Sequence, residues 1–233
     1  MIRKKGWNTR QLRIVGGDEA PSRFGLFHVS LQNLSGDHVC GGAVVSRWHI
    51  VTAAHCLYGA EPDYIKVLVG TTNLNKGGIK HDTASISIHG DFNFSARLND
   101  IGLLRVQKPF DLNHVRVIGL HETNLVEGDI VFLSGFGAQK VNGTSSTQMH
   151  VLTLPVFSQE TCKYAMRYTR EVADCMFCTF TKIGQGTCSD DKLVGLVSWG
   201  IPCARGFPDV HARITPFFKW IRSEIRNDIC GRK

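Results

Sequence analysis

Residues 49–56 of the chain, HIVTAAHC, lead from a run typical of a β-strand into a histidine beside a cysteine. The run is rich in β-branched side chains, which favour extended backbone. Similar segments recur between turns along the chain: HVSLQNL (28–34), IKVLVG (65–70), IGLLRVQ (101–107), DIVFLSGFG (129–137), VLTLPVF (151–157) and KLVGLVSWG (192–200). Short strands at even spacing predict an all-β sandwich or barrel rather than alternating strands and helices.

Length and composition agree with a folded β-domain. The chain has 233 residues, of which 42% are hydrophobic and 24 are glycine, enough for a buried core and many turns. No apolar run approaches the roughly 18 residues that a membrane span needs, and no fixed-period repeat predicts a solenoid. We therefore expect a globular protein with no membrane partner.

Two segments predict helices. Residues 158–168, SQETCKYAMRY, begin with Ser158, a residue type that caps helix N-termini well. Residues 215–227, TPFFKWIRSEIRN, place Thr215 at the predicted N-cap and Pro216 at the first helical position. Four large apolar side chains share one face of this second helix, which is therefore expected to dock on the body: Phe217, Trp220, Ile221 and Ile225.

The net charge of +7 is concentrated near the N-terminus. Residues 1–13, MIRKKGWNTRQLR, hold five basic side chains and no acidic one, and the remainder has 22 basic against 20 acidic residues. A nucleic-acid-binding domain would carry its basic residues as a patch on the folded surface. The distribution therefore predicts a basic leader and no nucleic-acid partner.

Eight cysteines indicate folding in an oxidising compartment. Three N-x-S/T sequons, at Asn33, Asn93 and Asn142, agree with that route. The N-terminal residues lack the apolar stretch of a secretory signal. We expect the protein to be extracellular, with its signal encoded upstream of Met1.

Three further segments, taken together with TAAHC (52–56), point to one protein family. Residues 13–17 read RIVGG, residues 99–104 read NDIGLL and residues 197–200 read VSWG. In this order, with His55 ahead of Asp100, the chain resembles the chymotrypsin-like (trypsin-family) serine proteases. The resemblance extends from Ile14 to the predicted C-terminal helix.

The resemblance implies a fold and a route of maturation. It implies two antiparallel six-stranded β-barrels with a C-terminal α-helix, in a protease domain over residues 14–233. Residues 1–13 become an activation segment that is cut between Arg13 and Ile14. A family member of this kind is a secreted, monomeric endopeptidase made as a zymogen. It acts on protein or peptide substrates, is a target of protease inhibitors and needs no cofactor or metal.

The resemblance also gives His55 and Asp100 their roles. A serine hydroxyl is too weak an acid to attack an amide unaided, so a neutral imidazole must accept its proton, and His55 matches that base. Asp100 would fix the tautomer of His55 and stabilise the imidazolium that forms. Seven other histidines have no supporting motif and are assigned no chemistry: His49, His81, His89, His114, His121, His150 and His211.

The nucleophile is missing from residues 184–200, GQGTCSDDKLVGLVSWG. In the family, a GDSGGP segment begins two residues after the cysteine that matches Cys188, and it supplies the serine and the oxyanion-hole N–H groups. No GDSGGP occurs in this chain, and nine residues, xGDSGGPLV, inserted after Cys188 would restore the family pattern. Counting from Cys188 places Asp191 at the family's aspartate and Lys192 at its serine. Ser189 is only a remote substitute, because no glycine follows it to build an oxyanion hole.

Three functions follow from this gap. The chain as written is predicted to be inactive, although its family consists of secreted serine endopeptidases. One alternative is an active endopeptidase whose sequence or splice form has lost GDSGGPLV. Another is a pseudoprotease that binds substrates or inhibitors. The lost residues would also begin a strand, so the second barrel is predicted to lack one strand and to be less stable than the first.

The resemblance assigns a specificity pocket as well. Its floor, entrance and wall would be formed by five residues: Gly186 at the floor, Ser198, Trp199 and Gly200 at the entrance, and Asp209 on the wall. A carboxylate on the wall is unusual and would admit a basic side chain. Residues 69–82 match the calcium loop of some members but lack clustered carboxylates, so no calcium is expected.

Family pairing implies three disulfides: Cys40–Cys56, Cys162–Cys178 and Cys188–Cys203. Cys175 and Cys230 are left over. Cys175 and Cys178 have CxxC spacing, but a redox or zinc site is not expected where Cys178 already has a structural partner.

Overall fold

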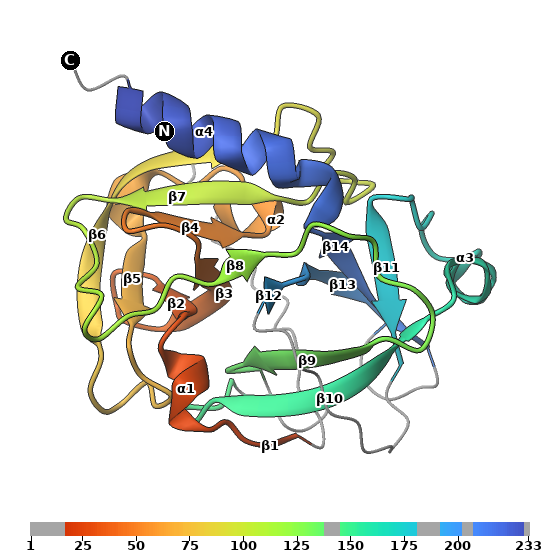
Figure 1. Cartoon of the computed structure of the whole chain (residues 1–233), viewed down its shortest axis with the longest axis horizontal. Helices are drawn as coiled ribbons and strands as arrows, with labels where there is room; N and C mark the ends of the chain where they lie inside the picture. Colours follow the sequence, from red (N-terminus) through yellow and green to blue (C-terminus); the bar gives the residue numbers. More distant parts are fainter. Residues whose placement is uncertain (1–16, 138–144, 181–191, 202–206, 231–233) are drawn as a thin grey trace, which may run out of the picture.

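The computed structural model describes residues 17–137, 145–180, 192–201 and 207–230 (Figure 1). Its first half is a closed antiparallel barrel, in which six strands pair in the order β2-β3-β4-β7-β6-β5. The strands are β2 (His28–Gln32), β3 (His38–Val44), β4 (His49–Thr52), β5 (Lys66–Val69), β6 (Ile79–Ile88) and β7 (Gly102–Val106). Each strand therefore has hydrogen-bonded neighbours on both sides, and closure leaves no open edge.

Side-chain alternation along the strands separates two cores. In β7, Leu104 and Val106 face the centre of the barrel, where they join the apolar side chains of the other five strands. Leu103, the residue before Leu104, belongs to a second cluster that includes residues of the C-terminal helix. One face of β7 therefore packs inside the barrel and the other packs against the C-terminal helix, because successive side chains point to opposite faces.

The second half is a six-stranded sheet whose path runs β1-β10-β11-β14-β13, with β9 paired to β10. The strands are β1 (Asp18–Glu19), β9 (Ile130–Gly135), β10 (His150–Phe157), β11 (Met176–Thr179), β13 (Gly195–Gly200) and β14 (Asp209–Arg213). Among the described residues no strand joins β13 to β9. The chymotrypsin-like β-architecture expected from the sequence is confirmed, whereas the loss of one strand stays a prediction, because residues 181–191 lie outside the described part.

Several short elements lie outside the two main sheets. They are the helices α1 (Ser22–Gly25), α2 (Ala54–Leu57) and η1 (Pro62–Tyr64), and a two-stranded parallel ladder of β8 (Gly119–Leu120) with β12 (Lys192–Leu193). Lys192, which counting from Cys188 places at the family's serine, lies exposed in this ladder opposite Gly119.

The first predicted helix forms as expected. Helix α3 spans Gln159–Met166, and the Ser158 side chain accepts a hydrogen bond from the Thr161 N–H, which satisfies one of the free amides of the first turn. No helix of the described residues is both long and apolar enough to cross a membrane.

The predicted start of the C-terminal helix is wrong. A 3₁₀ turn, η2 (Thr215–Phe217), precedes α4 (Phe218–Cys230), so Thr215 is not an N-cap of the α-helix. The Thr215 hydroxyl instead donates to the Thr123 carbonyl at 3.1 Å, a tertiary contact that no local pattern announces. The docking face is confirmed, because the apolar residues predicted on it pack with Ile101 and Leu103 where α4 crosses β7 (Figure 1).

Two of the three expected disulfides are present. Cys40 is bonded to Cys56, which ties α2 to β3, and Cys162 is bonded to Cys178, which ties α3 to β11. Cys175 is a free, half-buried thiol. The third pair, Cys188–Cys203, and the side chain of Cys230 lie outside the described residues.

Candidate active site

His55 is held on α2, the single helical turn that follows β4. This turn lies against β7 because Gly102 has no side chain. A Cβ atom at Gly102 would lie 2.8 Å from Cδ1 of Leu57, which is too close, and 3.1 Å from the carbonyl oxygen of Ser87, which is tight. The glycine of the NDIGLL segment therefore brings the histidine turn up to the strand that follows Asp100.

Asp100 meets His55 through two hydrogen bonds. Nδ1 of His55 lies 2.8 Å from Oδ2 of Asp100, and the backbone N–H of His55 donates to Oδ1 at 2.8 Å. The residue before the aspartate, Asn99, has φ of 52°, a left-handed conformation that asparagine tolerates better than most residues. Its side-chain amide donates to the Asp91 carbonyl at 3.0 Å, which helps to hold this turn.

A third group reaches Asp100 from the second half of the molecule. The hydroxyl of Ser198, on β13, donates to Oδ2 of Asp100, the oxygen that also faces His55. The Asp100 side chain is completely buried. Burial alone would raise the pKa of Asp100, but the hydrogen bonds and charge of His55, together with the Ser198 hydroxyl, lower it below its usual value. Asp100 therefore stays ionised and joins the two halves of the molecule.

This geometry sets what His55 can do. Because Nδ1 faces the carboxylate, it carries the proton, and Nε2 is left as the acceptor nitrogen. The His55 side chain is 16% exposed, so the imidazole is reachable while its partner is not. A buried carboxylate that orients a reachable imidazole is the general-base half of a serine-protease site.

The residues predicted to line the entrance and wall of the specificity pocket lie side by side. Gly200 is opposite Asp209 in the pairing of β13 with β14, and Trp199 is opposite Val210. A Cβ atom at Gly200 would lie 2.6 Å from Oδ1 of Asp209, so the carboxylate occupies the space that a side chain at Gly200 would need. Burial raises the pKa of Asp209 to about 6. The Asp209 carboxylate is therefore only partly solvated, and its place on the wall of a specificity pocket stays a prediction.

Several predicted site residues lie outside the described ranges. They are the activation pair Arg13 and Ile14, the pocket floor Gly186, and Ser189 with its neighbours Cys188 and Asp191. Among the described residues, the structure brings the predicted site residues together in two groups. The first is His55, Asp100 and Ser198. The second, which begins at the residue after Ser198, is Trp199, Gly200 and Asp209.

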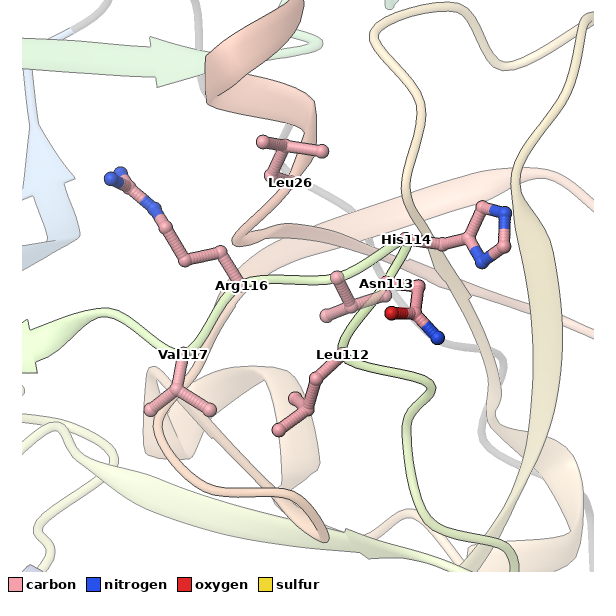
Figure 2. A pocket seen from close by; sticks show the side chains of 7 residues that line it. Leu26, Leu112, Asn113, His114, Arg116 and Val117 are labelled. Carbon is pink, nitrogen blue, oxygen red and sulfur yellow. The ribbon is translucent and has the colours of Figure 1, made fainter.

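Two other features of the described residues, a group of possible metal ligands and a surface hollow, have no assigned chemistry. The ligand atoms of Cys40, His55 and Cys56 lie within 4.8 Å of one another, but both sulfurs belong to a disulfide and a metal requires the thiolate. A hollow of about 370 Å³ lies beside residues 112–117 and Leu26 (Figure 2). None of the residues that line it belongs to the predicted site, and we assign it no function.

Sequence reasoning missed a buried histidine pair between the two halves. His28 Nδ1 lies 3.2 Å from the Ser134 hydroxyl of β9, and His38 Nδ1 lies 2.8 Å from the Ser30 hydroxyl. Both rings meet the edge or face of Phe136. Burial lowers the pKa of His28 to about 3, with a smaller contribution from His38, and burial lowers the pKa of His38 to about 4. No motif marks these residues, because their burial depends on the contact between the barrel and the sheet.

Comparison with known proteins identifies the family that the sequence motifs resemble. The model of the family "Trypsin" matches residues 14–221, most of the chain. The chain belongs to the trypsin family. Among its relatives in that family, it is 35% identical over 220 residues to Chymotrypsin-2 of Vespa crabro, which covers 90% of this chain and 98% of that protein. It is 30% identical over 230 residues to the vitellin-degrading protease of Bombyx mori, with 93% and 87% covered.

A solved structure of a trypsin-family protease shows the shared fold. Neuropsin, a serine protease expressed in the limbic system of mouse brain, superposes with a TM-score of 0.81 over 91% of this chain and 100% of that one, at 24% identity. At this identity the likeness shows the fold alone. The site residues of this trypsin-family chain are therefore argued from its own geometry.

Proposed function

We propose that the chain as written is a secreted, catalytically inactive member of the trypsin family that acts by binding protein or peptide ligands. One observation carries the proposal: an assembled His55–Asp100 pair stands in a chain whose sequence contains no GDSGGP segment. Two disulfides support the secreted location, since such bonds persist in oxidising compartments.

The missing segment would remove two catalytic contributions at once. Without the serine, His55 has no hydroxyl to activate, and loss of a triad nucleophile costs about 10⁶ in rate in well-studied cases. The same segment supplies the oxyanion-hole donors, each of which contributes about 10²–10³ in rate. No glycine directly follows Ser189 to supply them in another way. Proton acceptance by His55 is then the one catalytic function left, and alone it does not cleave a peptide bond.

A ligand could still bind along β13. Among the described strands, β13 pairs on one side only, with β14, and we propose that an extended peptide pairs with the other side of its backbone. The entrance residues Ser198, Trp199 and Gly200 belong to this strand. Asp209 lies beside Gly200, and above pH 6 its charge favours a ligand with a basic side chain. We therefore expect substrates or protease inhibitors to bind without being cleaved.

A serine-reactive fluorophosphonate probe tests the inactivity directly. The chain as written should stay unlabelled, whereas a variant with xGDSGGPLV inserted after Cys188 should be labelled at the new serine and hydrolyse peptide substrates. The matched control is the same insertion with His55→Ala, which should lose labelling because the hydroxyl is no longer activated. Labelling of the chain as written at Ser189 would overturn the proposal.

A second candidate is an active chymotrypsin-like endopeptidase whose written sequence has lost GDSGGPLV. The observation that favours it is the clean nine-residue gap, with family pattern intact on both sides of it. Sequencing the transcript and the genomic DNA across the codons for Phe180 to Trp199 decides between the candidates. Codons for the segment after Cys188 would establish the active enzyme, and uninterrupted CSDDK in both templates would establish the loss.

A further inference from the structure

An aromatic cluster lies on the surface beside the His55–Asp100 pair. Tyr58 follows directly after α2, which carries His55, and Phe92 and Phe94 lie in the loop that leads to Asp100. The rings of Tyr58 and Phe94 stack with centroids 4.9 Å apart, and Phe92 meets them at 5.8 Å and 6.3 Å. Tyr58 is 55% exposed and Phe94 is 46% exposed. The Arg97 guanidinium lies 4.5 Å from the centroid of the Phe94 ring, so Phe94 packs between Tyr58 and Arg97 and Tyr58 is the more open ring. Large aromatic surface left open in this way marks a place where something else packs.

The residue between the two phenylalanines is the asparagine of a sequon. Asn93, Phe94 and Ser95 form N-x-S, and both Asn93 and Ser95 are exposed. The loop around Asn93 is ordered by its own hydrogen bonds, because the Asn93 N–H donates to the Leu98 carbonyl at 3.0 Å and its side-chain oxygen accepts from the Ala96 N–H at 2.8 Å. The side-chain nitrogen, the atom to which a sugar is attached, makes no hydrogen bond to any described residue.

The other sequon in the described residues, at Asn33, differs in the hydrogen bonding of its side-chain nitrogen. The side-chain nitrogen of Asn33 donates to Asp37 at 2.9 Å, and its oxygen accepts from the Asp37 N–H at 2.9 Å, so the folded turn uses both ends of the amide. Among the described residues, no cluster of aromatic rings surrounds Asn33. Of the two, Asn93 is therefore the one whose folded surroundings suit an attached sugar.

We propose that Asn93 carries an N-linked glycan whose first sugar packs against the exposed Tyr58 ring. The C–H faces of a pyranose ring are apolar and fit an aromatic surface, while its hydroxyls stay in water. The attachment point lies between Phe92 and Phe94, so the tether holds the sugar beside the rings and little entropy is lost on contact. The glycan would cover the aromatic surface next to the His55–Asp100 pair. The inference rests on secretion, one part of the proposed function, and not on whether the chain hydrolyses peptides.

Mass spectrometry tests the attachment. The full chain, secreted from a eukaryotic cell behind an added signal, is digested before and after enzymatic release of N-linked glycans. We expect the peptide that contains residue 93 to carry glycan mass and to show aspartate at that position after release. The Ser95→Ala variant should lose this glycan, whereas Ser35→Ala should keep it. An unmodified Asn93 in the secreted protein would overturn the proposal.

Thermal unfolding tests the packing. The glycosylated protein should unfold about 2–4 °C above Ser95→Ala, the shift typical of one modest contact in a domain of this size. In a Tyr58→Ala background, the same Ser95→Ala change should shift the Tm by less than half as much. An equal shift in both backgrounds would show that the sugar does not pack on Tyr58. Neither measurement reads hydrolysis, so failure here is separate from failure of the proposed function.

Discussion

The two β-sheets of the molecule support the site in different ways. The first is a closed barrel, and it holds both His55, on α2, and Asp100, two residues before β7. The second supplies Ser198 and Asp209 and has no described strand between β13 and β9. Along the sequence, the gap after Cys188 precedes β13. The predicted proton-accepting half of the site is thus held by a closed barrel, and we predict that the half that would bind and attack the substrate belongs to a sheet that lacks one strand.

The largest expected effect concerns the second sheet. Inserting xGDSGGPLV after Cys188 should slow amide exchange in β13 and β14 by about 10²–10³-fold, because a restored strand would cover the open side of β13. Amides of β4 and β7, in the closed barrel, serve as the internal control and should change little. Hydrogen exchange that is equally slow in both sheets of the chain as written would contradict the comparison.

The next effect concerns the contact between the sheets at Asp100. Asp100→Asn should lower the free energy of unfolding by about 2–3 kcal/mol at pH 7, since buried donors of His55 and Ser198 lose their carboxylate. The pKa of Asp100 is lowered, so its contribution is present above the ordinary aspartate value and is lost as the pH falls through the folded value. The effect of the variant should therefore vanish in acid. Asp82→Asn, at an exposed ion pair with Lys66, is the control and should change stability little.

The buried histidines should make the molecule sensitive to acid. The pKa of His28 is lowered from 6.5 to about 3, so the unfolded chain binds a proton at pH 5 and the folded chain does not. This group alone should cost about 2 kcal/mol of stability between pH 7 and pH 5. Urea unfolding of His28→Gln should show a weaker loss over that range, and exposed His114→Gln should behave as wild type. An unchanged loss in His28→Gln would place the acid sensitivity elsewhere.

The ionised form of Asp209 should destabilise the second sheet at neutral and higher pH. Because burial raises its pKa to about 6, ionising it in the folded state costs free energy that grows as the pH rises from about 4 to 6 and stays constant above. Asp209→Asn should therefore stabilise the protein by about 1–2 kcal/mol at pH 8 and by little at pH 4. Exposed Asp63→Asn is the control. Equal stability of Asp209→Asn and wild type at pH 8 would show that the folded protein compensates the charge.

The smallest effect is expected at Asn99, beside the complete half of the site. Asn99→Ala should cost about 1 kcal/mol, because alanine tolerates a φ of 52° less well than asparagine and the hydrogen bond to Asp91 is lost. Asn99→Gly keeps the backbone conformation and loses only the hydrogen bond, so thermal unfolding of the pair separates the two causes. Equal losses in both variants would remove the conformational cause.

Two of the strands, β3 and β6, could not be predicted from a local sequence pattern. β3 (His38–Val44) contains two glycines, which weaken a strand pattern, yet a Cβ atom at Gly42 would lie 2.9 Å from Ile50 and Val51, so the neighbouring strand requires the glycine. β6 (Ile79–Ile88) has mostly polar residues in its first half and is held by its pairing with β5 and β7. These segments are strands because of what lies beside them.

The sequence by itself determined the β-class and the resemblance to the family, because both depend on residue type and order along the chain. The resemblance in turn implied the His55–Asp100 pair and the disulfides Cys40–Cys56 and Cys162–Cys178. Only the tertiary structure decided which groups are buried together. It placed Ser198 on Asp100, Asp209 against Gly200 and His28 against Ser134, in each case by bringing together segments far apart in sequence. Burial and charge pairing depend on distance in space, and no spacing along the chain encodes that distance.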